Sequence, residues 1–177
     1  MTGPSVALGE WLDALSARTA SPSGGSAAAV ALAAAAALAS MAARFSRTSL
    51  PDADVLVSTA EAARARALEL AAQDEAAFGA VSTGDAGHAA ALLRVATVPL
   101  EMVRLAAEMG PVLVRLAREG NERLRGDATV GIELLKAGAA GAAELVRIDA
   151  GALDDATRQR LLESLDEAER RLARALE

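Results

Sequence analysis

A chain of 177 residues, 53% of them hydrophobic, is long enough to bury a core as one domain. Its aromatic residues are Trp11, Phe45 and Phe78, and alanine supplies much of the apolar content, which excludes a β-sheet protein and predicts an all-α fold. A net charge of −6 without a basic cluster argues against a nucleic-acid partner. With no cysteine and His88 as the single histidine, neither a disulfide nor a thiolate or histidine-rich metal site is expected.

The first residues and the most apolar segment indicate the cellular compartment of the protein. The first residues, MTGPSVALGEWLD, lack the basic region and apolar core of a signal peptide. The run Ala27–Ala43 is long enough to suggest a membrane span, but its bulk is alanine, which prefers lipid much less than leucine does. We therefore expect a cytoplasmic protein without membrane contact.

The first expected helix covers Val6–Arg18, with one apolar face at helical spacing. A loop at Thr19–Gly25 follows, and a second helix is expected over Ser26–Arg47, because alanine has the best helix propensity. The small side chains of this helix let other helices approach closely. The Gly24-Gly25 pair before it indicates a flexible loop, and the N–H groups at the helix start can hold an anion.

A third helix is expected to be capped by Ser49, to carry Pro51 in its first turn and to end near Ser82. Its apolar stripe comprises Leu56, Ala60, Ala63, Ala67, Leu70, Ala77, Phe78 and Val81. Asp74 falls on the same stripe, four residues after Leu70 and four before Phe78. Residues 83–87 break this helix.

The fourth helical region, His88–Glu119, carries a seam of leucine, valine and methionine, and Pro99 and Pro111 predict kinks or short breaks in it. Gly120-Asn121 signals its end. We expect Asp127 to cap a fifth helix that reaches Ala150, and a charged last helix over Asp154–Glu177.

Long helices joined by short loops predict a single domain over residues 1–177, an up-and-down bundle of antiparallel helices. The second expected helix has small side chains on all sides and must be enclosed on most of them. One bundle of this size leaves part of it uncovered, and the seam Leu92–Leu116 offers further apolar surface, so a homodimer is expected.

Four stretches, in this order, resemble the cyclodeaminase/cyclohydrolase family, which includes the C-terminal half of formiminotransferase-cyclodeaminase and the stand-alone methenyltetrahydrofolate cyclohydrolases. They are ASPSGGSAAAVALAAAAALASMAARFSR, LAAQDEAAFGAV, ATVPLEMVRLA and EGNERLRGDATVGIELLKAGAAGAAELVRIDA, and the resemblance spans Val6–Ala150. It implies a homodimer of helical subunits that binds folate near the glycine-rich loop, in a groove between helices.

The chain also departs from the family pattern. Ser23 replaces one glycine of the family's Pro-Gly-Gly-Gly-Ser loop, and the tyrosine and lysine that usually follow the Asp-x-x-Ala-Phe segment are absent. Of the family's Asn-x-x-x-x-Ser-Asp motif, Asn121 and Asp127 remain. Of Asn-Val-Arg-Ile-Asn, Arg147 remains and both asparagines are replaced, the second by Asp149.

Asp74 is the first catalytic candidate, because a carboxylate on an apolar stripe must be paired, hydrogen-bonded or neutral. The alternative is a structural aspartate that bonds a neighbouring helix end. Asp127 is the second catalytic candidate, and as a cap at a cleft it would remain available to a ligand. Arg147 either pairs with Glu144 on its own helix or holds a folate carboxylate.

The resemblance further implies that substrate is bound by Ser23, Gly24, Gly25 and Ser26 through backbone N–H groups, and by Asn121. It implies cyclisation of formiminotetrahydrofolate with loss of ammonia, or hydrolysis of methenyltetrahydrofolate. Both reactions need proton transfer and stabilisation of a cationic amidine-like centre. The folate derivative is the substrate, and no metal or redox cofactor is implied. The alternative is a divergent homologue that keeps the fold and binds or converts another small molecule.

Overall fold

The computed structural model describes residues 8–83 and 88–177, which form six α-helices, a 3₁₀ turn and no strand. The all-α prediction is therefore confirmed. The helices are α1 (Leu8–Ser16), α2 (Gly24–Phe45), α3 (Ala53–Thr83), α4 (His88–Glu119), α5 (Arg125–Ala150) and α6 (Asp155–Ala175), with the 3₁₀ turn at Glu122–Leu124.

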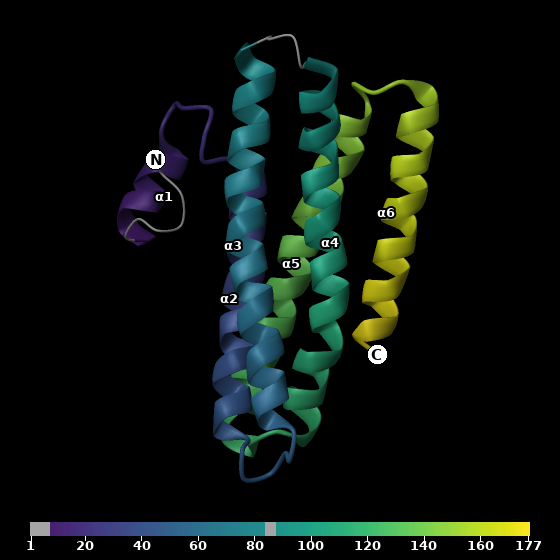
Figure 1. The fold of residues 1–177 in the computed structure, drawn as a ribbon. Coiled ribbons are helices and arrows are strands. Elements are labelled where there is room, and N and C mark those ends of the chain that lie inside the picture. The colour runs from purple at the N-terminus through teal and green to yellow at the C-terminus, as the bar shows by residue number, and fades with distance from the viewer. Residues whose placement is uncertain (1–7, 84–87) are drawn as a thin grey trace.

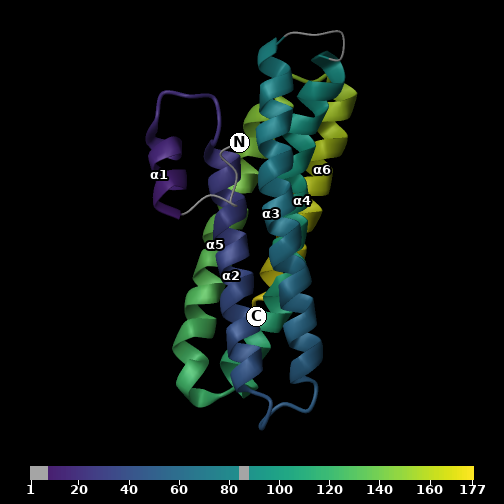
Figure 2. The same ribbon diagram turned by 60° about the vertical axis from the view of Figure 1, so that its left-hand side comes forward.

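Helices α2 to α6 run side by side along one long axis and alternate in direction, as an up-and-down bundle does (Figure 1). Turning the molecule shows α2 between α3 and α5 (Figure 2), and α2 packs against both of these helices. Helix α6 lies on the far side of α4, and α1 stands away from the bundle beside the beginning of α2. The predicted single helical bundle is thus confirmed.

Helix α2 is the centre of the bundle because alanine lets its neighbours come close. Twelve of its 22 residues are buried, and Ala29, Ala35 and Ala39 are completely inaccessible. Within the described part of the chain, α2 is the one helix long and apolar enough to cross a membrane. Since 61% of that apolar segment is buried inside the fold, α2 has the surroundings of a core helix.

Glycines on α5 set how closely it packs on α2. A Cβ added to Gly138 would lie 2.8 Å from the carbonyl oxygen of Ala28, and one added to Gly131 would lie 3.5 Å from that of Ala35. Seven residues forward along α5 thus match seven residues backward along α2, so the two helices are antiparallel. The missing side chains allow contact between the two backbones.

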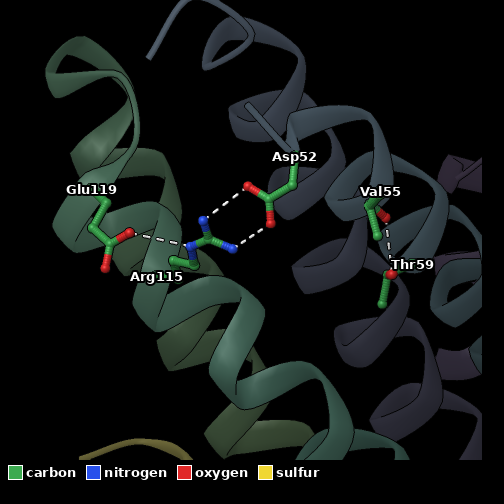
Figure 3. A network of polar contacts seen from close by, with 5 residues as sticks. All are labelled: Asp52, Val55, Thr59, Arg115 and Glu119. Carbon is green, nitrogen blue, oxygen red and sulfur yellow. Dashed lines mark hydrogen bonds and ion pairs between the residues drawn. The ribbon is translucent and has the colours of Figure 1, made fainter. Parts of the chain in front are cut away.

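The lower end of the bundle is tied by polar contacts. Arg115 of α4 forms a forked ion pair with Asp52, just before α3, with Arg115 Nη2 2.8 Å from Asp52 Oδ1, and Arg115 also contacts Glu119 (Figure 3). After α4, the backbone N–H of Asn121 donates to Ser46 Oγ at 2.9 Å, and its side-chain amide donates to the carbonyl of Phe45 at 3.0 Å. These bonds anchor the turn into α5 against the end of α2.

Several predicted boundaries and environments are wrong. Helix α2 begins at Gly24 with Ser23 as its N-cap, so the glycine pair belongs to the first helical turn and not to a loop. Pro99 and Pro111 do not break helix α4, which continues through both of them. Phe78, expected on the buried stripe, is 42% exposed, because it lies past the start of α2, where that helix no longer covers α3.

Further expectations about helix ends and faces fail. Asp127 does not cap α5; that helix starts at Arg125 after Leu124, and Asp127 lies inside its first turn because the 3₁₀ turn runs directly into the helix. Ser49 does not cap α3, because that helix begins at Ala53, and Pro51 lies before the helix rather than in its first turn. The seam Leu92–Leu116 does not offer outer surface, since most of it is buried within the chain's own core, and α1 buries Trp11 alone.

Candidate functional site

Asp74 of α3 lies directly against the first turn of α2. The Asp74 side chain is 7% exposed, and Ser23 Oγ donates a hydrogen bond to Asp74 Oδ2 at 3.2 Å. The backbone of Ser26 also bonds to the carboxyl group, and Ser26 Oγ accepts from Ser23 N at 3.5 Å. The N–H groups at the start of a helix, together with the helix dipole, favour a carboxylate in this position.

Gly25 is what allows Asp74 to come this close. A Cβ at Gly25 would lie 2.1 Å from Asp74 Oδ1 and 2.4 Å from its Cγ, so any side chain there would displace the carboxyl group. At Gly24, by contrast, no atom lies within 4 Å of an added Cβ, and this glycine is exposed. The two glycines therefore differ in their surroundings: Gly25 allows a close contact with Asp74, whereas Gly24 lies on an open surface.

The electrostatic surroundings keep the Asp74 carboxyl ready to carry a proton. Burial raises the pKa of Asp74 above its ordinary value of 3.8, and the neighbouring charge of Glu75 raises it further. The hydrogen bonds from Ser23 and Ser26 act in the opposite direction but do not cancel the effect of burial on the pKa. A carboxyl group with a raised pKa and a fixed position is suited to general acid and base chemistry.

Beyond the start of α2, the two flanking helices continue. Asp74 is level with Gly25, and α3 extends from there to Thr83, while α5 extends to Ala150. Asp149, near the end of α5, is half-buried, and its pKa is raised by burial and by the charge of Asp74. Asp74 and Asp149 thus both lie toward the N-terminal end of α2, and both carboxyl groups have raised pKa values.

Three buried polar atoms among the described residues have no hydrogen-bond partner: Trp11 Nε1, Ser21 Oγ and Glu75 Oε1. All three belong to the segments that lead into α2 or to the residue next to Asp74. Buried polar atoms in folded proteins are nearly always bonded, so unpaired ones call for an explanation.

The structure brings Ser23, Gly24, Gly25, Ser26 and Asp74 together and places the other predicted site residues elsewhere. Asn121 and Asp127 lie beside the C-terminal end of α2, where Asn121 bonds to Phe45. Gly25 and Phe45 are separated along α2 by about 30 Å at 1.5 Å per residue. Within one chain, Asn121 and Asp127 therefore do not reach Asp74.

Arg147 lies on a different side of α5 from Asp149. Its guanidinium contacts both carboxylate oxygens of Glu169 on α6, at 2.8 and 2.7 Å, and Glu144 at 3.8 Å. The predicted Glu144 pairing is confirmed, and the pair with Glu169 raises the pKa of Arg147. In this conformation the guanidinium is engaged between α5 and α6.

Asp149 is the residue of this end that sequence reasoning missed. Its position three turns after Gly138 on the α2-facing side of α5 emerges only from the packing of α5 on α2. Elsewhere, a surface groove of about 460 Å³ lies between α3 and α4, but its charged residues Arg66 and Glu108 sit on an open rim. The part of the chain that the structure describes has no cluster of three metal-ligating side chains.

Comparison with known proteins agrees with this architecture. The structure resembles the crystal structure of formiminotetrahydrofolate cyclodeaminase from Thermotoga maritima, with a TM-score of 0.90 and 29% sequence identity over 97% of this chain and 92% of that one. A search of curated proteins found no significant match. The sequence profile of formiminotransferase-cyclodeaminase matches residues 7–168, which is most of the chain. The chain therefore belongs to the formiminotransferase-cyclodeaminase family.

Proposed function

We propose that this protein is a formiminotetrahydrofolate cyclodeaminase, which closes a ring on the formimino carbon and releases ammonia. The observation that carries this proposal is the buried carboxyl of Asp74, held by Ser23 and Ser26 against the start of α2. Membership of the family and the likeness to a solved cyclodeaminase support the same reaction.

In this reaction Asp74 transfers protons at the reacting carbon. A nitrogen of the folate attacks the formimino carbon and must lose a proton, and the departing nitrogen must gain one. Burial raises the pKa of Asp74 above its ordinary value, which makes the carboxyl a better proton acceptor than an exposed aspartate. When ionised, the same carboxylate stabilises a cationic amidine-like centre.

The segment Ser23–Ser26 has a different part from the one expected from sequence. Its side chain and backbone donors hold Asp74, so Ser23 and Ser26 position the carboxyl rather than a ligand anion. The exposed Gly24 offers backbone to a substrate that lies over the helix end. Ring closure with loss of ammonia changes no oxidation state, so the proposal needs no redox cofactor. We propose that the reaction needs no metal ion either, and a chelator should therefore leave the rate unchanged.

The test is turnover of formiminotetrahydrofolate by purified protein, with methenyltetrahydrofolate formation followed by absorbance and ammonia by a coupled assay. We expect one ammonia for each methenyl product. Hydrolysis of methenyltetrahydrofolate without ammonia release would instead identify a cyclohydrolase. If neither folate reacts or shifts the melting temperature, the alternative of a divergent homologue with another ligand replaces the proposal.

We further propose that two copies of the chain associate through the outer sides of α2 and α5. Both helices carry a stripe of small and apolar residues that faces away from the bundle core and is partly or fully exposed. On α2 the stripe is Ala27, Val30, Ala31, Ala34, Leu38, Met41 and Phe45, and on α5 it is Val130, Leu134, Ala137, Gly141 and Ile148. Exposed apolar residues grouped on one side of a protein in this way are typical of a protein–protein contact.

An antiparallel arrangement of the two copies would bring together residues of the family motifs that lie at opposite ends of a single chain. It sets the lower end of one chain, with Asn121 and Asp127, beside the upper end of the other, with Asp74. Light scattering should give twice the chain mass of 17.9 kDa. Ala34→Glu, at the middle of the surface, should yield monomers, and Ala65→Glu, an exposed alanine on α3, should not. A wild type that stays at the monomer mass at every concentration contradicts the proposal.

A further inference from the structure

Helix α1 carries an apolar stripe that its own chain covers along one edge only. The stripe consists of Leu8, Trp11, Leu12 and Leu15, which follow one another at helical spacing. At about 100° per residue, Trp11 and Leu15 form one edge of this stripe, and Leu8 and Leu12 form the other. Trp11 is 4% exposed and Leu15 is half-buried, whereas Leu8 is 66% exposed and Leu12 is 50% exposed. Trp11 therefore anchors α1 to its own chain, while the edge with Leu8 and Leu12 is left uncovered.

This uncovered edge lies on the side of the bundle that carries the proposed contact between two copies. In both views α1 stands away from α4 and α6, beside the beginning of α2 (Figures 1 and 2). The apolar stripe on the outer side of α2 begins there with Ala27 and Val30. A second copy that packs on α2 and α5 therefore also comes next to α1.

We propose that α1 packs on the second copy of this chain, with Leu8 and Leu12 buried between the two copies. This inference rests on the proposed dimer, whose antiparallel arrangement sets the upper end of one chain beside the lower end of the other. Because α1 belongs to the upper end, its uncovered edge faces the lower end of the partner. Each copy then holds the other with its own α1, next to the place where Asp74 of the same chain lies.

Free charges on the two surfaces favour this contact. On α1, Asp13 is exposed and forms no ion pair with a described residue. At the lower end, Arg123 and Arg125 are exposed and also form no ion pair within the described part of the chain, although Glu122 and Asp127 are close to them in the sequence. Opposite charges that meet across an interface fix the orientation of the two partners.

Leu12→Ser tests the inference, because it removes an exposed apolar side chain from α1 and leaves Trp11 in place. A dimer contains two such contacts, so we expect the dissociation constant of the dimer to rise about 10-fold or more. Sedimentation equilibrium measures this constant. Leu93→Ser is the matched control, since Leu93 is 40% exposed on α4, away from α1, and its loss should leave the constant unchanged. Fluorescence of Trp11, the single tryptophan of the chain, verifies that α1 keeps its anchor in each variant.

Hydrogen exchange of the α1 amides gives a second readout. In a single chain α1 is held by one fully buried side chain, so its amides should exchange readily, whereas contact with the partner should protect them. We expect exchange about 10-fold slower or more in the wild-type dimer than in the Ala34→Glu monomer. A dissociation constant that Leu12→Ser leaves unchanged overturns this inference and leaves the proposed dimer standing, as do α1 amides that exchange equally fast in dimer and monomer. A wild type that stays at the monomer mass overturns the proposed dimer, and this inference with it.

Discussion

Gly25→Ala is the smallest change that separates the Asp74 carboxyl from the start of α2. The added methyl carbon would lie 2.1 Å from Asp74 Oδ1 and 2.4 Å from Cγ and Oδ2. Nonbonded heavy atoms rest at about 3.5 Å or more, so the overlap is about 1.4 Å. The carboxyl group must move, and in moving it loses the hydrogen bond from Ser23.

The expected cost follows from that displacement. Overpacking of a buried contact lowers the free energy of unfolding by about 1–3 kcal/mol. A misplacement of about 1 Å at a reacting group can lower the rate about 100-fold, so we expect at least that loss in kcat. Gly24→Ala is the matched control for stability: with open space around its new methyl group, its free energy of unfolding should equal that of the wild type or exceed it by up to about 1 kcal/mol.

Urea unfolding and steady-state cyclodeaminase kinetics on both variants measure the two quantities. A double variant isolates the contact. In an Asp74→Ala background the methyl group at Gly25 has no carboxyl to displace, so it should not lower the free energy of unfolding. Gly25→Ala with the stability of Gly24→Ala and the kcat of the wild type would refute the reasoning, as would an equal loss of stability with and without Asp74.

Two further predictions concern the scaffold. The bond from Arg115 holds the pKa of Asp52 below its ordinary value of 3.8, so the stability that Asp52 contributes is present above that value and is lost as the pH falls through its lowered pKa. In urea unfolding, Asp52→Asn should therefore be less stable than wild type at about pH 7, and the difference should shrink as the pH falls below 3.8. A difference that does not change with pH contradicts the ion pair. Gly138→Ala places a methyl group 2.8 Å from the Ala28 carbonyl oxygen and should lower the free energy of unfolding by about 1–3 kcal/mol. Gly126→Ala, with nothing within 4 Å, should not, and equal melting temperatures would disprove the close α2–α5 contact.

Asp74 could be predicted from the sequence because helical periodicity alone puts a charged residue on a buried stripe. Glycine and polar residues mark the ends of α4 and α5, so these ends were also predicted closely. The start of α2 was misplaced because Gly24-Gly25 reads as a loop. Small residues after a serine cap can equally form the first helical turn, and only the contact with Asp74 reveals why glycine is there.

Which residues share the site could not be predicted, because the order of motifs along the sequence does not give the distances between them in space. Asn121 and Asp127 follow one another closely in the motif, yet the length of α2 separates them from Asp74. Asp149 needed the opposite information, the antiparallel register of α5 on α2, which the contacts of Gly131 and Gly138 define. Sequence patterns identify faces of helices, whereas the level of each residue along the bundle comes from packing.

Asp74→Asn is the most direct test of the central claim that a buried carboxyl at the start of α2 performs the chemistry. Because burial raises the pKa of Asp74, the folded protein binds its proton more tightly than the unfolded chain does. Stability contributed by Asp74 therefore rises as the pH falls through the folded pKa toward 3.8, and above the folded pKa the ionised group favours unfolding. The account predicts that Asp74→Asn loses about 10²–10⁴ in kcat per folded molecule while its unfolding free energy at neutral pH is equal to or above that of the wild type. Unchanged turnover together with lowered stability would show that Asp74 is structural and would contradict the account.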